Sequence, residues 1–167
     1  ASLADKGGAV PPLSLWRQIN ALAAGLVELG LKPGERIGIW SQNNAEWALV
    51  QFATAKAGLI LVNINPAYRS SELEYALTKS GCSALITSPD FKSSNYLEIL
   101  EKLAPELADW APGQLNAKRL PALKTIIRLG DEKTSVMFNF NQVIDQGTAA
   151  AKQQLDDLVG QLQFDDA

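Results

Sequence analysis

The sequence contains no histidine and only one cysteine, Cys82. Without histidine, the Ser-His-Asp and Cys-His systems that activate a nucleophile are excluded. The sequence also lacks the commonest zinc ligand, and a single thiolate cannot form a cysteine-based metal site. One thiol also cannot form an internal disulfide, so we expect a reducing compartment, the cytoplasm.

Two other features are missing, a long apolar run and an excess of basic charge. No apolar run approaches the roughly 20 residues that span a bilayer, and no signal-peptide pattern opens the chain. We therefore expect no transmembrane segment. The net charge is −3, from 15 basic and 18 acidic residues. Because nucleic acids are bound through dense basic stripes, and none is present, we expect no nucleic-acid partner.

The sequence does contain enough apolar material for one compact domain. Of its 167 residues, 47% are hydrophobic, and a domain of this size buries roughly 70% of the surface that its unfolded chain exposes. Gly7, Gly8, Pro11 and Pro12 indicate a loose leader over residues 1–12. We interpret residues 13–167 as one α/β unit.

Strand and helix patterns alternate along the chain. Apolar and β-branched runs predict strands over residues 36–40, 59–62, 84–87 and 125–129. Apolar residues at helical spacing predict helices that begin near residues 15, 43, 70, 93, 140 and 148 and end near residues 29, 57, 79, 104, 147 and 159. This alternation, with short connections, predicts an α/β fold of three layers, a parallel sheet with helices on both faces.

The second predicted helix and the strand after it carry the most specific expectations. Asn43 or Asn44 is expected to cap the helix. The run over residues 59–62 predicts a buried parallel strand. The expected apolar face of the helix comprises Trp47, Val50, Phe52, Ala53 and Ala57.

The third predicted helix and the region near residue 110 carry two further expectations. Ser70 or Ser71 is expected to cap the helix, with Glu72 and Glu74 in its first turn, where the helix dipole favours acidic groups. Residues 105–122 hold three prolines and are interpreted as a surface excursion.

Three sequence patterns can be compared with the motifs of known catalytic or binding sites. Gly25 and Gly30 have the glycine spacing of a phosphate loop, but Leu31 stands where that loop needs lysine. The dinucleotide signature Gly-x-Gly-x-x-Gly does not occur, which argues against a Rossmann cofactor. Close carboxylate pairs are required for one kind of acid–base catalysis. We interpret those present as helix surface or chain terminus: Glu72 with Glu74, Asp156 with Asp157, and Asp165 with Asp166.

Three further residues are candidates for a functional site. Cys82 precedes an apolar strand and is interpreted as a small buried hydrophobe rather than a nucleophile. Tyr68 and Arg69 follow a predicted strand, at the place where open α/β sheets bind ligands. These two are the candidates for contact with a ligand or a partner domain.

Four segments, at the right separations, resemble the adenylate-forming superfamily, which comprises acyl-CoA synthetases, luciferases and peptide-synthetase adenylation domains. Leu29 to Ile39 resembles its Leu-Gly-Val-x-x-Gly-Asp-x-Val motif, and Asn43 to Trp47 its Asn-x-x-Glu helix start. Lys56 to Pro66 is similar to its Lys-Ala-Gly…Asn-Pro segment, and Ser71 to Cys82 continues in register. Within the superfamily, Asn65 to Tyr75 is especially similar to the medium-chain fatty-acid branch of acyl-CoA synthetases.

The sequence departs from the family pattern at both ends. Leu13-Ser14-Leu15-Trp16 stands where members have Leu-Thr-Tyr-x-x-Leu. The family's phosphate loop, its Tyr-x-x-Thr-Glu segment, its ribose-binding Asp and its carboxy-terminal catalytic Lys are not found. In the family, the phosphate loop follows a segment similar to Phe164-Asp165-Asp166. We therefore expect an amino-terminal α/β subdomain that is incomplete and cut before that loop.

The resemblance implies an AMP-forming acid–thiol ligase for the full-length protein. In such an enzyme, a fatty-acid carboxylate attacks the α-phosphate of Mg-ATP, and coenzyme A then displaces AMP from the acyl-adenylate. ATP, Mg²⁺ and coenzyme A are implied for the full-length enzyme, and no catalytic, cofactor-binding or metal residue is assigned in this chain. The expected partners are the fatty acid and the missing remainder of the same chain, with a homodimer as a further possibility.

Two alternatives stay open at this point. One is another adenylating enzyme, which activates an aryl or amino acid and has the same opening segments. The other is a non-catalytic α/β module used for binding. Under the main interpretation, the 167-residue chain alone makes no acyl-adenylate.

Overall fold

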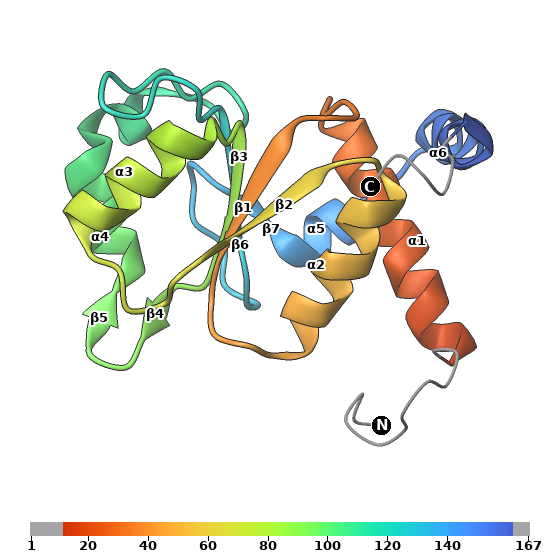
Figure 1. Ribbon diagram of the computed structural model, residues 1–167, viewed down its shortest axis with the longest axis horizontal. Helices are drawn as coiled ribbons and strands as arrows, with labels where there is room; N and C mark the ends of the chain where they lie inside the picture. The colour runs from red at the N-terminus through yellow and green to blue at the C-terminus, as the bar shows by residue number, and fades with distance from the viewer. Residues whose placement is uncertain (1–11, 162–167) are drawn as a thin grey trace.

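The computed structural model describes residues 12–161 and contains a five-stranded parallel sheet at its centre (Figure 1). The strand order is β2-β1-β3-β6-β7. The strands are β1 (Arg36–Trp40), β2 (Ile60–Ile64), β3 (Ala84–Thr87), β6 (Thr125–Arg128) and β7 (Phe138–Asn139).

Helices cover both faces of this sheet, as Figure 1 shows, so the predicted three-layer α/β fold is confirmed. A separate two-stranded antiparallel hairpin is formed by β4 (Asp90–Phe91) and β5 (Ser94–Asn95). The helices are α1 (Leu13–Glu28), α2 (Ala45–Lys56), α3 (Ser70–Ser80), α4 (Tyr96–Leu103), the 3₁₀ helix η2 (Pro105–Asp109), α5 (Phe140–Asp145) and α6 (Ala149–Gln161).

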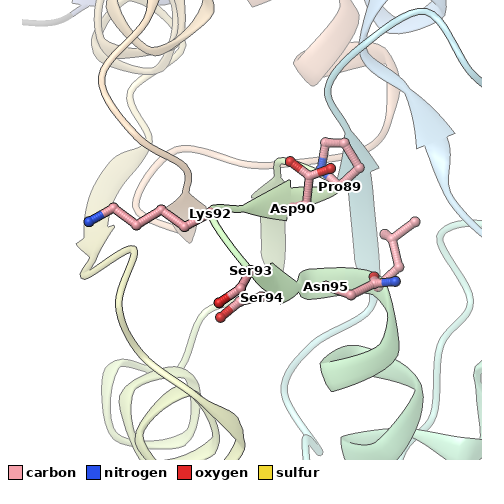
Figure 2. A pocket seen from close by; sticks show the side chains of 7 residues that line it. Pro89, Asp90, Lys92, Ser93, Ser94 and Asn95 are labelled. Carbon is pink, nitrogen blue, oxygen red and sulfur yellow. The ribbon is translucent and has the colours of Figure 1, made fainter.

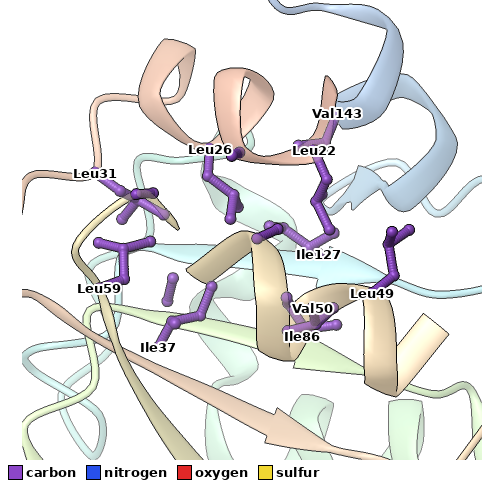
Figure 3. Packing of buried hydrophobic residues seen from close by; sticks show 14 of the residues in the cluster. Leu22, Leu26, Leu31, Ile37, Leu49, Val50, Leu59, Ile86, Ile127 and Val143 are labelled. Carbon is purple, nitrogen blue, oxygen red and sulfur yellow. The ribbon is translucent and has the colours of Figure 1, made fainter. Parts of the chain in front are cut away.

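One face of the sheet is covered by α1, α2 and α5, with α6 packed against α1, and we call this layer the α1 face (Figure 3). Leu22 and Leu26 of α1 are fully buried above Ile37 of β1 and Ile86 of β3. Gly25 lies where α1 crosses α5, and a Cβ placed on it would stand 1.9 Å from the Val143 carbonyl oxygen. Only glycine permits this approach, because any side chain would force the two helices apart.

The opposite face packs against α3, α4, η2 and the segment 110–124, and we call this layer the α3 face. Leu73 of α3 and Leu100 of α4 are fully buried there. The irregular segment adds Leu115, Leu120 and Leu123, each at most 3% exposed. Most other residues of 105–122 are exposed, so the segment runs over the surface as expected, and its buried apolar residues also join the core.

The strand β2 lies at an edge of the sheet, so the expectation of a buried strand is wrong. Ile60 is 47% exposed, because β2 is the last strand on that side of the sheet formed by residues 12–161. The neighbouring helix α2 also differs in one residue from its predicted apolar face. Val50, Ala53 and Ala57 are buried, whereas Phe52 is 42% exposed and Leu49 is buried in its place.

Helix ends account for most of the remaining differences. Asn44, one of the two predicted caps, accepts a hydrogen bond from the Trp47 N–H at 2.8 Å. Arg69, rather than Ser70 or Ser71, occupies the N-cap position of α3, where the Glu72 carboxylate accepts from the Arg69 N–H. The predicted helix over 93–104 begins only at Tyr96, because Ser94 and Asn95 pair with β4. Of the predicted leader, residues 1–11 lie outside the described residues.

Candidate functional site

The carboxyl ends of all five strands meet in one row, since Ile64, Trp40, Thr87, Arg128 and Asn139 are successive neighbours in the sheet register. Open parallel sheets bind ligands outside this edge, where the connecting loops diverge. The row and its loops are therefore the candidate functional site.

Two serine hydroxyls meet where β1 and β3 end. The Ser88 Oγ donates to the Ser41 Oγ at 2.7 Å, and the Ser41 Oγ donates to the Gln42 carbonyl at 2.9 Å. Both side chains are buried. A serine nucleophile needs a base that accepts its proton, and within residues 12–161 both protons are committed to neutral oxygens. This pair thus joins two loops and does not form a nucleophile.

Arg128 is a nearly buried cation at the end of β6, with 8% of its surface exposed. Its Nη1 donates to the Thr134 Oγ1 at 2.7 Å, and its Nη2 to a Glu132 carboxylate oxygen at 3.1 Å. The Asn139 side chain donates to the carbonyls of Gly130 and Glu132 at 2.9 and 3.1 Å. These bonds hold the loop between β6 and β7 and engage two of the three guanidinium nitrogens of Arg128, whereas its buried Nε has no partner among the described residues.

An aromatic pair ties together the loops after β1, β2 and β3. The rings of Trp40 and Tyr96 stack with 3.5 Å between centroids and 7° between planes. The Tyr96 hydroxyl donates to the Pro66 carbonyl, and its backbone N–H donates to the Pro89 carbonyl at 3.1 Å. Burial raises the pKa of Tyr96 to about 12, so the phenol stays protonated and acts as a donor rather than a base.

The two loop residues predicted to contact a ligand or partner, Tyr68 and Arg69, follow β2 in the chain. Tyr68 packs, half-buried, against the core of the α3 face, whereas Arg69 is exposed at the start of α3. The structure therefore separates their roles, because Tyr68 belongs to the core of the α3 face. Arg69 is the one of the two whose side chain is open to a partner.

A shallow polar hollow of about 310 Å³ lies at the β4–β5 hairpin, close to the carboxyl end of β3 (Figure 2). Lys92 at its rim has a φ of 54°, in the left-handed region. Figure 2 shows that the Lys92 side chain extends away from Asp90, so the opposite charges do not converge on a shared point. The lining residues are Pro89, Asp90, Lys92, Ser93, Ser94, Asn95 and Leu97.

The remaining candidate residues have structural roles. Cys82 is fully buried, as predicted, and burial raises the pKa of its thiol. Hydrogen bonds from the backbone N–H groups of Glu72 and Arg69 lower the pKa of Glu72, which lies in the first turn of α3. Glu74 forms an ion pair with Arg119. Asp165 and Asp166 lie outside the described residues.

The described part of the chain offers no set of three or more histidine, cysteine or acidic side chains placed to bind a metal ion. Asp156 and Asp157 are exposed on α6. In the same part of the chain, no helix is both long and apolar enough to span a membrane.

Sequence reasoning missed Ser41, Ser88 and Tyr96. A usable signal existed for the serines, because each directly follows a predicted strand and adjacent parallel strands end at the same edge. For Tyr96 no such signal existed, since its partners Trp40 and Pro66 lie 56 and 30 residues away in sequence.

Comparison with known proteins assigns this fold to a family. The model of the family described as AMP-binding enzyme matches residues 14–160. The mitochondrial medium-chain acyl-CoA ligase ACSF2 of Danio rerio is 42% identical over 151 residues, which are 90% of this chain and 25% of that protein. The putative acyl-CoA synthetase YngI of Bacillus subtilis (strain 168) is 41% identical over 128 residues, 77% of this chain and 23% of that protein.

A solved structure agrees with these relatives. The anthranilate CoA ligase AuaEII, in complex with anthranoyl-AMP, has a TM-score of 0.64 and 25% identity, with 80% of this chain and 22% of that chain covered. The chain thus spans about a quarter of the length of the relatives it matches. Since the family model covers nearly all of the described residues, this chain belongs to the AMP-binding enzyme family.

Proposed function

We propose that this chain forms the amino-terminal part of a fatty-acid–CoA ligase, which makes an acyl-adenylate from ATP and then an acyl-CoA. The observation that carries the proposal is 42% identity over 90% of the chain with a protein named as a medium-chain acyl-CoA ligase. A medium-chain fatty acid is accordingly the proposed substrate class. ATP, Mg²⁺ and coenzyme A are the proposed co-substrates of the longer protein.

The described residues contain no phosphate-loop motif for Mg-ATP, because Leu31 stands where such a loop needs lysine. In nucleotide sites, Mg²⁺ is bound through one or two carboxylates and the substrate phosphates, and among residues 12–161 no group of three or more His, Cys or acidic side chains is placed to bind a metal ion by itself. The buried cation Arg128 is bound within its own loop. We therefore derive no reaction step from these residues and propose that the chain acts as a scaffold, whose sheet and loops support one wall of the larger enzyme.

A chimeric enzyme tests the proposal. The matching segment of the Danio rerio ligase is replaced by this chain, and acyl-CoA formation from ATP, coenzyme A and octanoate is measured. We expect the chimera to form acyl-CoA, and the 167-residue chain alone to release no pyrophosphate. An aryl acid is assayed in parallel, to separate a fatty-acid ligase from an aryl-acid ligase. A chimera that folds but activates none of these acids would refute the scaffold proposal.

Two further parts of the proposal concern the cell and the assembly. The cytoplasmic location follows from the single buried thiol, and cell fractionation tests it. The relative from Danio rerio is itself named mitochondrial, so recovery of this protein from mitochondria is the contrary result. A homodimer and an incomplete subdomain that stops before the phosphate loop stay predictions.

A further inference from the structure

The two edges of the central sheet are built differently. The edge strand β7 has two residues, whereas the opposite edge strand β2 has five, Ile60–Ile64. Residues 59–65 contain no charged side chain and no proline. Natural edge strands are usually protected by shortness, charge, proline or a bulge. β7 is protected by its shortness, and β2 has none of the sequence-based protections.

The backbone of β2 leaves regular hydrogen-bonding groups open. The Ile60 N–H donates to the Glu35 carbonyl at 2.9 Å, on the side of β1. Because backbone groups alternate in direction along a strand, residues 60, 62 and 64 bond to β1 in the parallel register. The N–H and C=O groups of Leu61 and Asn63 therefore point away from β1, to the side where the described sheet ends.

Apolar side chains accompany these open groups. Ile60 is 47% exposed, and Phe52 on the adjacent helix α2 is 42% exposed. Leu61 and Val62 are half-buried. An uncharged, β-branched strand with a free edge pairs readily with another strand.

We propose that β2 pairs, in the longer protein of the proposed function, with a β-strand from the part of the polypeptide that lies beyond the matched quarter. The relatives are about four times as long as the segment they share with this chain. A strand in the same polypeptide is favoured over a free partner, because a five-residue edge buries much less than the roughly 800 Å² per partner of a stable interface. Tethering compensates through a high effective concentration.

Hydrogen exchange of the β2 backbone tests this pairing. Exchange of the 59–65 peptide is followed by mass spectrometry with residue-level fragmentation, in the 167-residue chain and in the chimeric ligase. We expect the amides of Leu61 and Asn63 to exchange at least about 100-fold more slowly in the chimera, because an added strand supplies their acceptors. The amides of Ile60 and Val62, which already bond to β1, are protected in both proteins and serve as the internal control.

A matched pair of variants connects the protection to the open edge. Asn63→Pro removes an outward N–H that has no acceptor in the sheet of this chain, whereas Asn63→Thr keeps it. In the chimera we expect Asn63→Pro to return the Leu61 amide to within about threefold of its rate in the chain alone. Asn63→Thr is expected to leave that amide protected.

The outcomes separate this proposal from the proposed function. An active chimera in which Leu61 and Asn63 exchange as fast as in the chain alone would overturn the pairing and keep the ligase. An inactive chimera in which both amides are protected would keep the pairing and refute the ligase. Protection in the 167-residue chain alone that grows with protein concentration would identify a second copy as the occupant, and would also overturn the proposal.

Discussion

The two faces of the sheet are packed by different means. On the α1 face, regular helices approach so closely that Gly25 touches the backbone of α5. On the α3 face, the core is formed by α3 and α4 together with an irregular segment, which contributes Leu115, Leu120 and Leu123. Polar contacts hold this second layer in place, among them the bond from Tyr96 to Pro66 and the ion pair of Arg119 with Glu74.

This difference shows two routes to a buried core. Closely packed helices cannot move together to fill a gap, so the α1 face should be sensitive to every change of volume. An irregular segment can adjust its backbone, so the α3 face should tolerate truncation better and depend more on its hydrogen bonds. The predictions below test this contrast, from the largest expected effect to the smallest.

Truncation of a buried leucine should cost more on the α1 face than on the α3 face. Leu22 in α1 is 0% exposed, and Leu120 in the irregular segment is 2% exposed. We expect Leu22→Ala to lower the free energy of unfolding by about 4 kcal/mol, and Leu120→Ala by about 2 kcal/mol, because a site that relaxes leaves a smaller cavity. Urea unfolding measures both values. Equal losses would remove the proposed difference between the faces.

Gly25→Ala should destabilise the protein, although alanine is the better helix former. Helix propensity alone predicts a gain of up to about 1 kcal/mol. The added Cβ would lie 1.9 Å from the Val143 carbonyl oxygen, so α1 and α5 must separate, and we expect a net loss of about 3 kcal/mol. Urea unfolding checks the sign. Gln18→Ala, at an exposed position of the same helix, is the control and should be neutral or stabilising.

Tyr96→Phe should weaken the α3 face through a lost hydrogen bond. The half-buried Pro66 carbonyl loses its donor, and we expect a loss of about 1–2 kcal/mol. Tyr68→Phe is the matched control, since the Tyr68 hydroxyl forms no hydrogen bond within the described residues. Thermal unfolding of the two variants gives the comparison, and equal melting temperatures would contradict the role assigned to Tyr96.

The same tyrosine makes stability depend on pH in the alkaline range. The pKa of Tyr96 is about 12 in the folded protein and 10.0 in the unfolded chain. The unfolded state therefore loses its proton first, so the contribution is fully present below pH 10 and is lost as the pH rises toward 12. We expect Tyr96→Phe to reduce the decline in stability between pH 10 and 12, relative to the Tyr68→Phe control. Unfolding in urea at a series of pH values measures this decline.

The smallest expected effect concerns the cap of α2 on the α1 face. Asn44→Ala removes the acceptor of the Trp47 N–H, and we expect a loss of about 1 kcal/mol. Asn43→Ala, one residue earlier, removes no cap bond and is expected to change stability by less than about 0.5 kcal/mol. Equal losses from the two variants, in chemical unfolding, would show that the cap bond adds nothing.

Prediction from sequence succeeded where local pattern and tertiary packing agree. The helix over Leu13–Glu28 and the strand Arg36–Trp40 follow directly from apolar spacing and β-branched residues. The prediction failed where neighbours distant in sequence decide the outcome. Ser94 and Asn95 are compatible with a helix start, yet they pair with β4. The strand β7 was missed because two residues carry no detectable period.

The candidate site was predictable only in its location. The alternation of strands and helices places ligand-facing loops at the carboxyl edge, and Tyr68 and Arg69 were selected on that basis. Which of the two is exposed depends on the packing of Tyr68 against the core of the α3 face. The role of Arg128 could not be predicted from the sequence, because its burial and its bonds to Thr134 and Glu132 arise only when the loop after β6 folds back.

The sequence by itself determined the fold class, the order of the main elements and, through its motifs, the family. Those properties depend on local periodicity and on residues close together along the chain. Only the tertiary structure decided that β2 is an open edge, that residues 105–122 enter the core, and that Tyr96 joins three loops. These depend on which distant segments become neighbours, and a one-dimensional pattern does not contain that information.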